Sequence, residues 1–357
     1  MRICFYARPF LPSVGGIENT TLHLATAWTS LGHTVTLVTE QPAEPDYDVQ
    51  FSFVIVRRPG KLDWKQVLAN SDIVISNGQS LRPLLHWLRA GVPFGYIHAM
   101  AGRGGLQHGL GVAVRGWVGC IANRLASFNV CVSRFVAKSV CVHNPIVIYN
   151  FAAPIFRPMS APASGRFLYY GRIIQEKGVD TLIEAVGICK KNGHRIEVDI
   201  VGDGNWKYLA VAMAQRLGIA DRVAFKPSQY GEELVGTINA ARAVVVPSHC
   251  NEGFGMVVIE AMACGKCVIV ARDGGVPEVA DGYALTFQPG DAGALANCLA
   301  DTAADDRLIA AYGQLGLARA RDLTLEKAAE RYIILFREVL ARARGPARRK
   351  GACGHLL

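Results

Sequence analysis

The sequence lacks the features that mark a membrane-spanning, secreted or nucleic-acid-binding protein. It contains no uncharged apolar run of about 18 residues, the minimum for a membrane-spanning helix. The apolar segment before Arg8 and Pro9 is too short for a secretory signal peptide. Neither a zinc-finger spacing nor an RNA-binding signature is present. These absences predict a cytoplasmic protein that binds no nucleic acid.

Metal-binding patterns are also scarce. Among ten cysteines, only Cys264 and Cys267 form a C-x-x-C, and neither a second pair nor a histidine pair completes a zinc set. Asp46 and Asp48 form one D-x-D, a pattern that can hold a divalent metal. These two residues lie in a proline-containing loop, which is typical of solvated acidic residues. The sequence therefore predicts buried thiols and no metal site.

The charge is unevenly distributed along the chain, whose formal net charge is +9. Residues 1–155 carry 13 basic and 7 acidic side chains, residues 156–340 carry 20 and 22, and residues 341–357 carry 5 and none. The positive excess therefore sits in the first half and in the tail. Such an excess fits contact with an anionic membrane surface or with an anionic substrate.

The length of 357 residues favours two domains, because single hydrophobic cores stop growing at roughly 250–300 residues. Residues 150–164 are rich in proline, alanine and serine and are interpreted as the linker. The predicted domains are residues 1–155 and 164–324, followed by an amphipathic helix over residues 325–342. Residues 343–357 are predicted to form a basic solvated tail, with a membrane anchor as the alternative.

Short apolar runs alternate with helical patterns in both halves, which predicts an α/β fold with doubly wound parallel sheets. The expected strands are residues 3–6, 34–39, 51–56, 73–76, 94–97, 130–132, 146–148, 167–170, 196–201, 223–226, 244–246 and 267–270. In such folds, ligands bind beyond the carboxyl ends of the strands. The residues that follow each strand are therefore the candidates for a site.

The segment from residue 244 to 279 carries the strongest site signal. A buried strand and a glycine-rich loop precede a helix that begins near Met256. Gly253 and Gly255, on either side of Phe254, allow a ligand close to the backbone, and the start of the helix favours an anion. The segment therefore predicts a site for a phosphorylated ligand.

Two carboxylates accompany this loop, Glu252 within it and Glu260 on the helix. An ionised carboxylate only accepts hydrogen bonds, so it suits the adjacent hydroxyl groups of a ribose or a pyranose. Phosphate at the helix start and hydroxyl groups on the carboxylates together indicate a nucleotide-sugar. The alternative is that each carboxylate is a solvated surface residue.

Charged and flexible residues follow other strands of the second half. Arg172 offers a bidentate fork and Lys177 a point charge, which would suit a diphosphate, although a surface ion pair is the alternative. Gly202 and Asp203 follow the next strand, and Lys226 ends the one after it, where a nucleotide base could be recognised.

Two positions in the first half also face the expected site. Gly15 and Gly16 precede a helix over residues 17–31 and allow a second close approach to a phosphate or sugar, with a plain turn as the alternative. His98 ends the strand at residues 94–97 and is therefore placed for chemistry, with a structural histidine as the alternative.

A candidate helix over residues 116–128 carries an apolar stripe of Trp117, Ile121, Leu125 and Phe128. This spacing predicts a helix that packs on the core. Because Arg115 and Arg124 lie beside the stripe, a basic surface that touches a membrane is the alternative.

The chain resembles the retaining glycosyltransferases of family 4, the glycosyl transferases group 1. This family has the GT-B architecture, in which two Rossmann-like domains face each other across a cleft. The resemblance extends over nearly the whole chain and is most specific in the second half. It rests on Gly15-Gly16-Ile17-Glu18, His98, residues 130–133, residues 147–150, Gly171-Arg172, Glu176-Lys177-Gly178, residues 201–204, Pro247-Ser248, residues 252–255, residues 260–263 and residues 274–278.

The resemblance implies a role for each candidate residue. Arg172 and Lys177 would hold the diphosphate, Glu260 the ribose hydroxyl groups, and Glu252 the donor sugar, while His98 would lie near the anomeric carbon. The implied catalytic residues are His98, Glu252, Arg172 and Lys177, and the implied donor-binding residues are Gly15, Gly16, Gly202, Asp203, Lys226, Gly253, Phe254, Gly255, Met256 and Glu260. No metal or other cofactor is implied, because cationic side chains and the helix dipole would neutralise the diphosphate.

The resemblance also implies a domain arrangement and a reaction. Residues 1–155 would bind the acceptor, residues 164–324 the donor, residues 325–342 would cross back to the first domain, and the linker would act as a hinge. A hexose would pass from a GDP- or UDP-sugar to a glycan or lipid-linked acceptor by attack on the face that the leaving phosphate occupies.

The implied pathway is the synthesis of a cell-surface polysaccharide or lipopolysaccharide at the inner face of the cytoplasmic membrane. The sequence leaves two alternatives open. One is a soluble glycosyltransferase that acts on a small metabolite, and the other is a relative that only binds nucleotide-sugar. Ala99, residues 151–152 and Cys267 depart from the family pattern.

Overall fold

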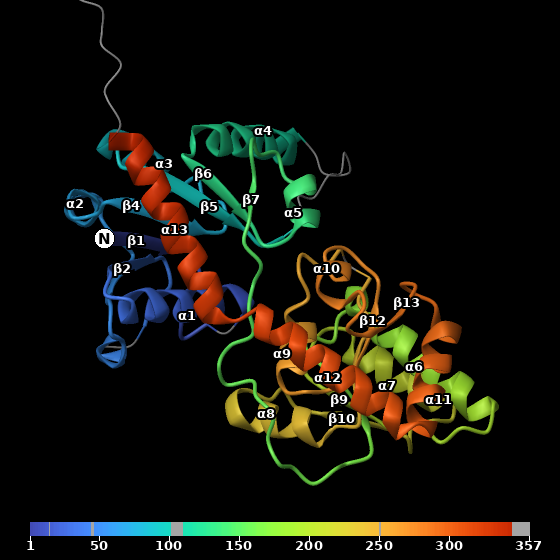
Figure 1. The fold of residues 1–357 in the computed structure, drawn as a ribbon. Helices are drawn as coiled ribbons and strands as arrows, with labels where there is room; N and C mark the ends of the chain where they lie inside the picture. Colours follow the sequence, from blue (N-terminus) through green and yellow to red (C-terminus); the bar gives the residue numbers. More distant parts are fainter. Residues whose placement is uncertain (14, 44–45, 101–109, 250, 345–357) are drawn as a thin grey trace, which may run out of the picture.

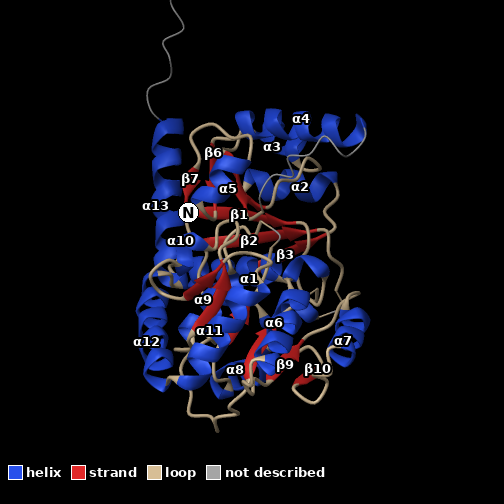
Figure 2. Ribbon diagram, turned by 90° about the vertical axis from the view of Figure 1, so that its right-hand side faces the viewer, coloured by secondary structure: helices blue, strands red, loops and turns tan. Residues whose placement is uncertain are grey.

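The structure, a computed structural model, describes residues 1–13, 15–43, 46–100, 110–249 and 251–344. The predicted tail therefore lies outside the described residues from residue 345 onward. The described chain forms two parallel sheets, each flanked by helices, and Figure 2 shows them one above the other. The predicted α/β fold with doubly wound sheets is confirmed.

The first sheet has seven parallel strands in the order β3-β2-β1-β4-β5-β6-β7. The strands are β1 (Arg2–Ala7), β2 (Thr34–Thr39), β3 (Val54–Arg57), β4 (Ile73–Asn77), β5 (Phe94–His98), β6 (Phe128–Cys131) and β7 (Ile146–Val147). The helices are α1 (Gly16–Ser30), α2 (Lys61–Ala69), α3 (Leu84–Ala90), α4 (Leu110–Leu125) and α5 (Arg134–Ser139), with a short 3-10 turn, η1 (Tyr47–Gln50).

The second sheet has six parallel strands in the order β10-β9-β8-β11-β12-β13. The strands are β8 (Phe167–Tyr170), β9 (Val198–Val201), β10 (Val223–Lys226), β11 (Val244–Val246), β12 (Val268–Ala271) and β13 (Leu285–Phe287). The helices are η2 (Gln175–Lys177), α6 (Val179–Lys191), α7 (Lys207–Arg216), α8 (Gly231–Ala240), α9 (Met256–Ala263), α10 (Pro277–Ala280), α11 (Ala292–Ala304) and α12 (Asp306–Asp322).

Alternating side chains along each strand build the cores on both sheet faces. In β1, Phe5 packs with Trp28 of α1 on one face, whereas Tyr6 packs with Trp64 and Trp87 on the other. Both faces are buried, which explains why the strands are nearly continuous apolar runs. Every strand pair in both sheets is parallel, so the carboxyl ends of the strands lie at the same edge of each sheet.

The last helix of the described residues, α13 (Leu325–Arg344), returns to the first domain and lies beside α1 (Figure 1). The ring of Trp28 lies 5.6 Å from that of Tyr332 and 5.4 Å from that of Phe336. The indole Nε1 of Trp28 also donates to the carbonyl of Ala329 at 3.3 Å. The amphipathic face of α13 therefore completes the core of the first domain.

The segment predicted as a linker is anchored at its first residues. Phe151 is buried, and Ala152 forms a bridge with Thr324, which precedes α13. Residues 153–166 then run to β8 without a helix or strand. The two crossings between the domains, residues 150–166 and residues 323–325, are thus joined to each other.

Two predictions about α4 are wrong. The helix ends at Leu125, and Phe128 belongs to the buried strand β6, so it is not part of the helical stripe. The other stripe residues do not face the core, since Trp117, Ile121 and Leu125 are 68%, 36% and 49% exposed. Helical spacing alone does not say which side of a helix is buried. No helix in the described part of the chain is long and apolar enough to cross a membrane.

Candidate active site

The two domains touch where β5 and β6 end opposite the glycine-rich loop before α9. A Cβ atom on Gly253 would lie 2.2 Å from the carbonyl oxygen of Ala99, which follows β5. The hydroxyl of Ser133, after β6, donates to the carbonyl of Gly253 at 2.6 Å. Only glycine permits this approach, so the loop lies directly against the strand end that carries His98.

Lys177 and Glu252 form an ion pair within this region, and both side chains are about four-fifths buried. The backbone holds the pair in place, because the amide of His249 donates to the carbonyl of Glu176 at 3.0 Å. A Cβ atom on Gly178 would lie 2.0 Å from the carbonyl oxygen of Pro247. The two loops are therefore packed backbone to backbone, and the predicted cation and carboxylate are brought together.

Arg172 lies on the loop that follows β8, and its side chain is exposed. Tyr169 donates its hydroxyl to the carbonyl of Arg172 at 2.7 Å, and the amide of Ile173 donates to the carbonyl of Asp203 at 2.8 Å. Gly202 supports the same loop, since a Cβ atom there would lie 1.9 Å from the carbonyl oxygen of Gly171. These contacts fix the loop backbone and leave the guanidinium group able to meet a ligand.

Glu260 on α9 contacts the strand end that precedes Arg172. Its carboxylate accepts a hydrogen bond from the hydroxyl of Tyr170 at 3.3 Å. Burial raises the pKa of Glu260 to about 8, and the Tyr170 hydrogen bond opposes that rise only in part. A carboxylate in such a setting gains from additional donors, such as the two hydroxyl groups of a ribose.

The remaining residues of the glycine-rich loop lead into the start of α9. The ring of Phe254 is buried and lies 5.8 Å from that of Tyr149, so its side chain is part of the core. Gly255 adopts φ 95° and precedes Met256, the first residue of α9. The left-handed backbone at Gly255 turns the chain into the helix start, where amide groups favour an anion.

His98 lies at the end of β5 within a network of buried amides. Its Nε2 is 3.0 Å from Oδ1 of Asn129, and Nδ2 of Asn129 donates to the carbonyl of Asn123 at 2.9 Å. Because that second bond turns the Asn129 oxygen toward the ring, we infer that Nε2 carries the proton and Nδ1 is the acceptor. Burial lowers the pKa of His98, against the effect of the Asn129 bond, and this favours the neutral ring.

Three predicted donor-binding residues, Lys226, Asp203 and Gly15, are not arranged as expected for binding a donor. The ammonium group of Lys226 lies 2.6 Å from the buried carboxylate of Asp199 and turns back along the sheet. The carboxylate of Asp203 is 75% exposed and accepts from the amide of the next residue. At Gly15, a Cβ atom would lie 2.6 Å from the carboxylate of Glu18, so the start of α1 carries its own negative charge.

Gly16 follows at an open position, with no atom within 4 Å of where its Cβ atom would be. No described contact joins it to the second domain, so its predicted approach to the donor phosphate stays a prediction.

Several residues of the junction were not predicted to be part of the site. Tyr170 and Asn129 contact Glu260 and His98, and Ser133, Tyr149 and Glu278 join the two domains. Tyr170 could have been found, because it ends a buried strand immediately before the candidate arginine loop. Ser133, Tyr149 and Glu278 lie in segments on which the family resemblance rests, but their contacts, like that of Asn129, join distant parts of the chain and could not be read from a local pattern.

The candidate metal patterns do not form a site. Arg57 makes a bidentate ion pair with Asp48 at 2.8–3.2 Å, which occupies one carboxylate of the D-x-D. Cys264 and Cys267 are buried, and burial raises their pKa to about 11 and about 12. Among the described residues, no group of three His, Cys, Asp or Glu side chains is placed to hold a metal ion.

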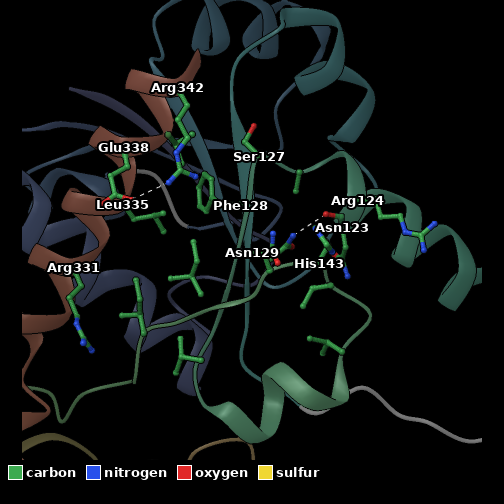
Figure 3. Close-up of a pocket in the computed structure, with 18 of the residues that line it drawn as sticks. Asn123, Arg124, Ser127, Phe128, Asn129, His143, Arg331, Leu335, Glu338 and Arg342 are labelled. Atoms are coloured by element: carbon green, nitrogen blue, oxygen red, sulfur yellow. Dashed lines mark hydrogen bonds and ion pairs between the residues drawn. The ribbon is translucent and has the colours of Figure 1, made fainter. Parts of the chain in front are cut away.

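A groove of about 1060 Å³ lies elsewhere, between α13 and the carboxyl-terminal end of α4 (Figure 3). Arg331, Glu338 and Arg342 reach into it from α13, and Arg124 comes from α4. Glu338 pairs with Arg342 at 3.7 Å. Apolar side chains line much of the groove, together with several basic residues and Glu338. Asn129, the partner of His98, also lines it, so the groove adjoins the network around His98.

Comparison with known proteins identifies a matching family model and relatives that match about half of the chain. Residues 160–316 match the family model of the glycosyl transferases group 1. The chain is 34% identical over 189 residues to a D-inositol 3-phosphate glycosyltransferase of Segniliparus rotundus, a match that covers 50% of this chain and 41% of that protein. The protein of the same name from Mycolicibacterium smegmatis is 35% identical over 195 residues, covering 51% and 43%. The matches thus span less than half the length of these relatives.

Solved structures share the fold over nearly the whole chain. HepE of Anabaena in complex with UDP and glucose has a TM-score of 0.79 at 19% identity, covering 95% of this chain and 100% of that one. WaaG, a glycosyltransferase involved in lipopolysaccharide biosynthesis, has a TM-score of 0.68 at 16% identity, covering 96% and 100%. These similarities show the arrangement of the two domains.

Proposed function

Because residues 160–316 belong to the glycosyl transferases group 1 and the whole chain has the GT-B fold, we propose that it is a nucleotide-sugar-dependent glycosyltransferase. The observation that carries the proposal is the ion pair between Lys177 and Glu252, which lies beside Gly253 at the contact with Ala99. A cation for a diphosphate and a carboxylate for sugar hydroxyl groups therefore meet in the loops of the second domain that face the end of β5. The donor is a GDP- or UDP-hexose.

Each charged group has a chemical part in this proposal. Arg172 and Lys177 bind the diphosphate and neutralise the charge that grows on it as the sugar leaves. Glu260 accepts from the ribose hydroxyl groups, and Glu252 orients the sugar and stabilises the positive charge at its anomeric carbon. Nδ1 of neutral His98 accepts from a sugar hydroxyl group. The acceptor attacks the face that the leaving phosphate occupies and gives that phosphate its proton, so the configuration is retained and neither a protein nucleophile nor a metal is needed.

The donor experiment tests the proposal directly. UDP and GDP, with their glucose and mannose derivatives, are titrated against the chain, and release of the nucleoside diphosphate is followed. We expect Arg172→Ala to weaken binding of the preferred nucleotide about 10- to 100-fold, because it loses charge-assisted hydrogen bonds. Arg216→Ala, at an exposed arginine at the end of α7, is the matched control and should bind as the wild type does. Equal affinity of the Arg172 variant and the wild type would refute the assignment.

The acceptor is a glycan or a lipid-linked saccharide of a surface polysaccharide or lipopolysaccharide. The exposed face of α4, made of Trp117, Ile121 and Leu125 with Arg124 beside it, supports this choice. An aromatic and aliphatic stripe flanked by a basic residue suits the interface of an anionic bilayer. The relatives named D-inositol 3-phosphate glycosyltransferases point instead to a small phosphorylated polyol as the competing acceptor class.

Vesicle co-sedimentation distinguishes these acceptor classes. We expect the wild-type chain to bind vesicles of phosphatidylglycerol and not those of phosphatidylcholine. The double variant Trp117→Ser/Ile121→Ser should bind about tenfold less, because it loses apolar surface that would enter the interface. Leu62→Ser, at an 81% exposed leucine of α2, is the control for general surface hydrophobicity. Failure of the wild type to sediment with anionic vesicles would favour the soluble acceptor.

A further inference from the structure

Glu278 of α10, in the second domain, reaches across to the first domain. Its Oε2 accepts from the amide of Arg134 at 2.8 Å, and its Oε1 accepts from the amide of Phe135 at 2.7 Å. The hydroxyl of Tyr149 also donates to Oε2 at 3.0 Å. One carboxylate therefore satisfies two of the amides at the start of α5 and a tyrosine beside the interdomain crossing.

The start of α5 is joined to the candidate active site by a second contact. Ser133 caps the helix by accepting from the amide of Val136 at 3.0 Å, and the same hydroxyl donates to the carbonyl of Gly253 at 2.6 Å. The amide of Val132 donates to the carbonyl of His98 at 3.1 Å, which ties this turn to the end of β5. A shift of α5 would consequently move Gly253 relative to His98.

Within the second domain, the segment that leads to Glu278 also contacts the glycine-rich loop. The amide of Gly275 donates to the carbonyl of Glu252 at 2.7 Å, and a Cβ atom on Gly275 would lie 2.3 Å from the carbonyl oxygen of Gly253. Arg319 of α12 fixes the backbone of Glu278 through a hydrogen bond to its carbonyl at 2.7 Å. The segment from Gly275 to Glu278 thus supports the loop at one end and holds α5 at the other.

We propose that Ser133, Tyr149 and Glu278 form an interdomain latch, in which Glu278 is the positioning residue that sets the glycine-rich loop against the His98 strand end. This inference rests on the proposed function for its effect on transfer. The donor-binding groups Arg172, Lys177 and Glu260 all lie in the second domain. Loss of the latch should therefore leave donor binding intact and impair only the step that needs both domains.

The test compares Glu278→Gln with Asp281→Asn, which removes an exposed carboxylate three residues away that pairs with Arg272 inside the same domain. The substitution E278Q keeps the shape of the side chain, removes its charge and replaces one acceptor oxygen by a donor. We expect kcat to fall about 10- to 100-fold in E278Q, with the Kd for UDP and GDP within about twofold of the wild type. Tyr149→Phe, which removes one hydrogen bond, should show a smaller loss of kcat. If E278Q does not fold, this variant tests the latch in its place.

Hydrogen exchange supplies a readout that does not depend on activity. The amides of residues 134 and 135 should exchange at least about tenfold faster in E278Q than in the wild type, whereas D281N should match the wild type. Unchanged exchange at these amides, or a loss of nucleotide affinity in proportion to kcat, overturns the latch. If the wild type releases no nucleotide from any donor, the proposed function fails, and the exchange measurement still decides whether the latch exists.

Discussion

Replacing Lys177 by methionine is expected to lower kcat of sugar transfer by about 10²- to 10³-fold. The ammonium group lies at the end of η2 against Glu252, where the proposed reaction has the diphosphate leave the sugar. A preorganised cation at a site of growing negative charge contributes more to the transition state than to the bound donor. The nucleotide should therefore bind only modestly more weakly, and most of the loss should appear in kcat. Steady-state kinetics with the preferred donor measure both quantities.

Two further variants test whether the loss of kcat depends on the positive charge at Lys177. Lys177→Arg keeps the cation and should recover part of kcat, although its planar fork does not reproduce the geometry of an ammonium group. Lys191→Met, at an exposed lysine in the last turn of α6, controls for the loss of one surface charge. A kcat of Lys177→Met within about threefold of the wild type would contradict the assigned role.

Glu260 should make the free energy of unfolding depend on pH. Its pKa in the folded protein is about 8, raised from 4.5 by burial. Between these values the folded chain binds a proton that the unfolded chain has released, so stability falls as the pH rises. We expect the wild type to lose about 3 kcal/mol relative to Glu260→Gln between pH 5.5 and pH 8.5. Urea unfolding of both proteins at several pH values in this range measures the difference.

The control for this titration is Glu233→Gln, at an exposed glutamate of α8. Its pH profile should run parallel to that of the wild type. Parallel profiles for Glu260→Gln and the wild type would show that burial does not shift the pKa of Glu260 as described.

If Glu260 binds the ribose as proposed, the same proton links donor binding to pH. Hydroxyl groups of a ribose donate to an ionised carboxylate, so binding of the nucleotide favours loss of the proton from Glu260. Nucleotide affinity should rise with pH up to about pH 8 and then level off. Glu260→Gln should abolish this dependence, which calorimetry in buffers of different ionisation enthalpy would detect as proton release.

The sequence contained enough information for the fold and for the proximity of Lys177 and Glu252. Buried parallel strands are recognisable as apolar runs, and the residues after them must meet at one sheet edge. This is why Lys177 and Glu252, which are 75 residues apart, could be expected to face the same ligand. Their ion pair is the closest agreement between the predicted and the observed arrangement.

The remaining parts of the site depend on tertiary contacts that local patterns do not encode. Glu278 and Phe135 are separated by 143 residues, and neither position carries a signal that names the other. Lys226 ends a strand as expected, but its direction is decided by the buried Asp199. Likewise, the stripe on α4 shows helical spacing, but the buried residues among those described in this helix are the small or polar Gly119, Ala122 and Asn123, which no apolar pattern singles out.

The return of α13 to the first domain has a consequence for biosynthesis. Tyr332 and Phe336 pack on Trp28, which leaves the ribosome some 300 residues earlier. Until the last helix is translated, the nascent amino-terminal half exposes an apolar strip on α1 that chaperones or neighbouring nascent chains can engage. The core of the first domain is therefore complete only after α13 has been translated. Premature termination before residue 325 should yield an aggregating fragment.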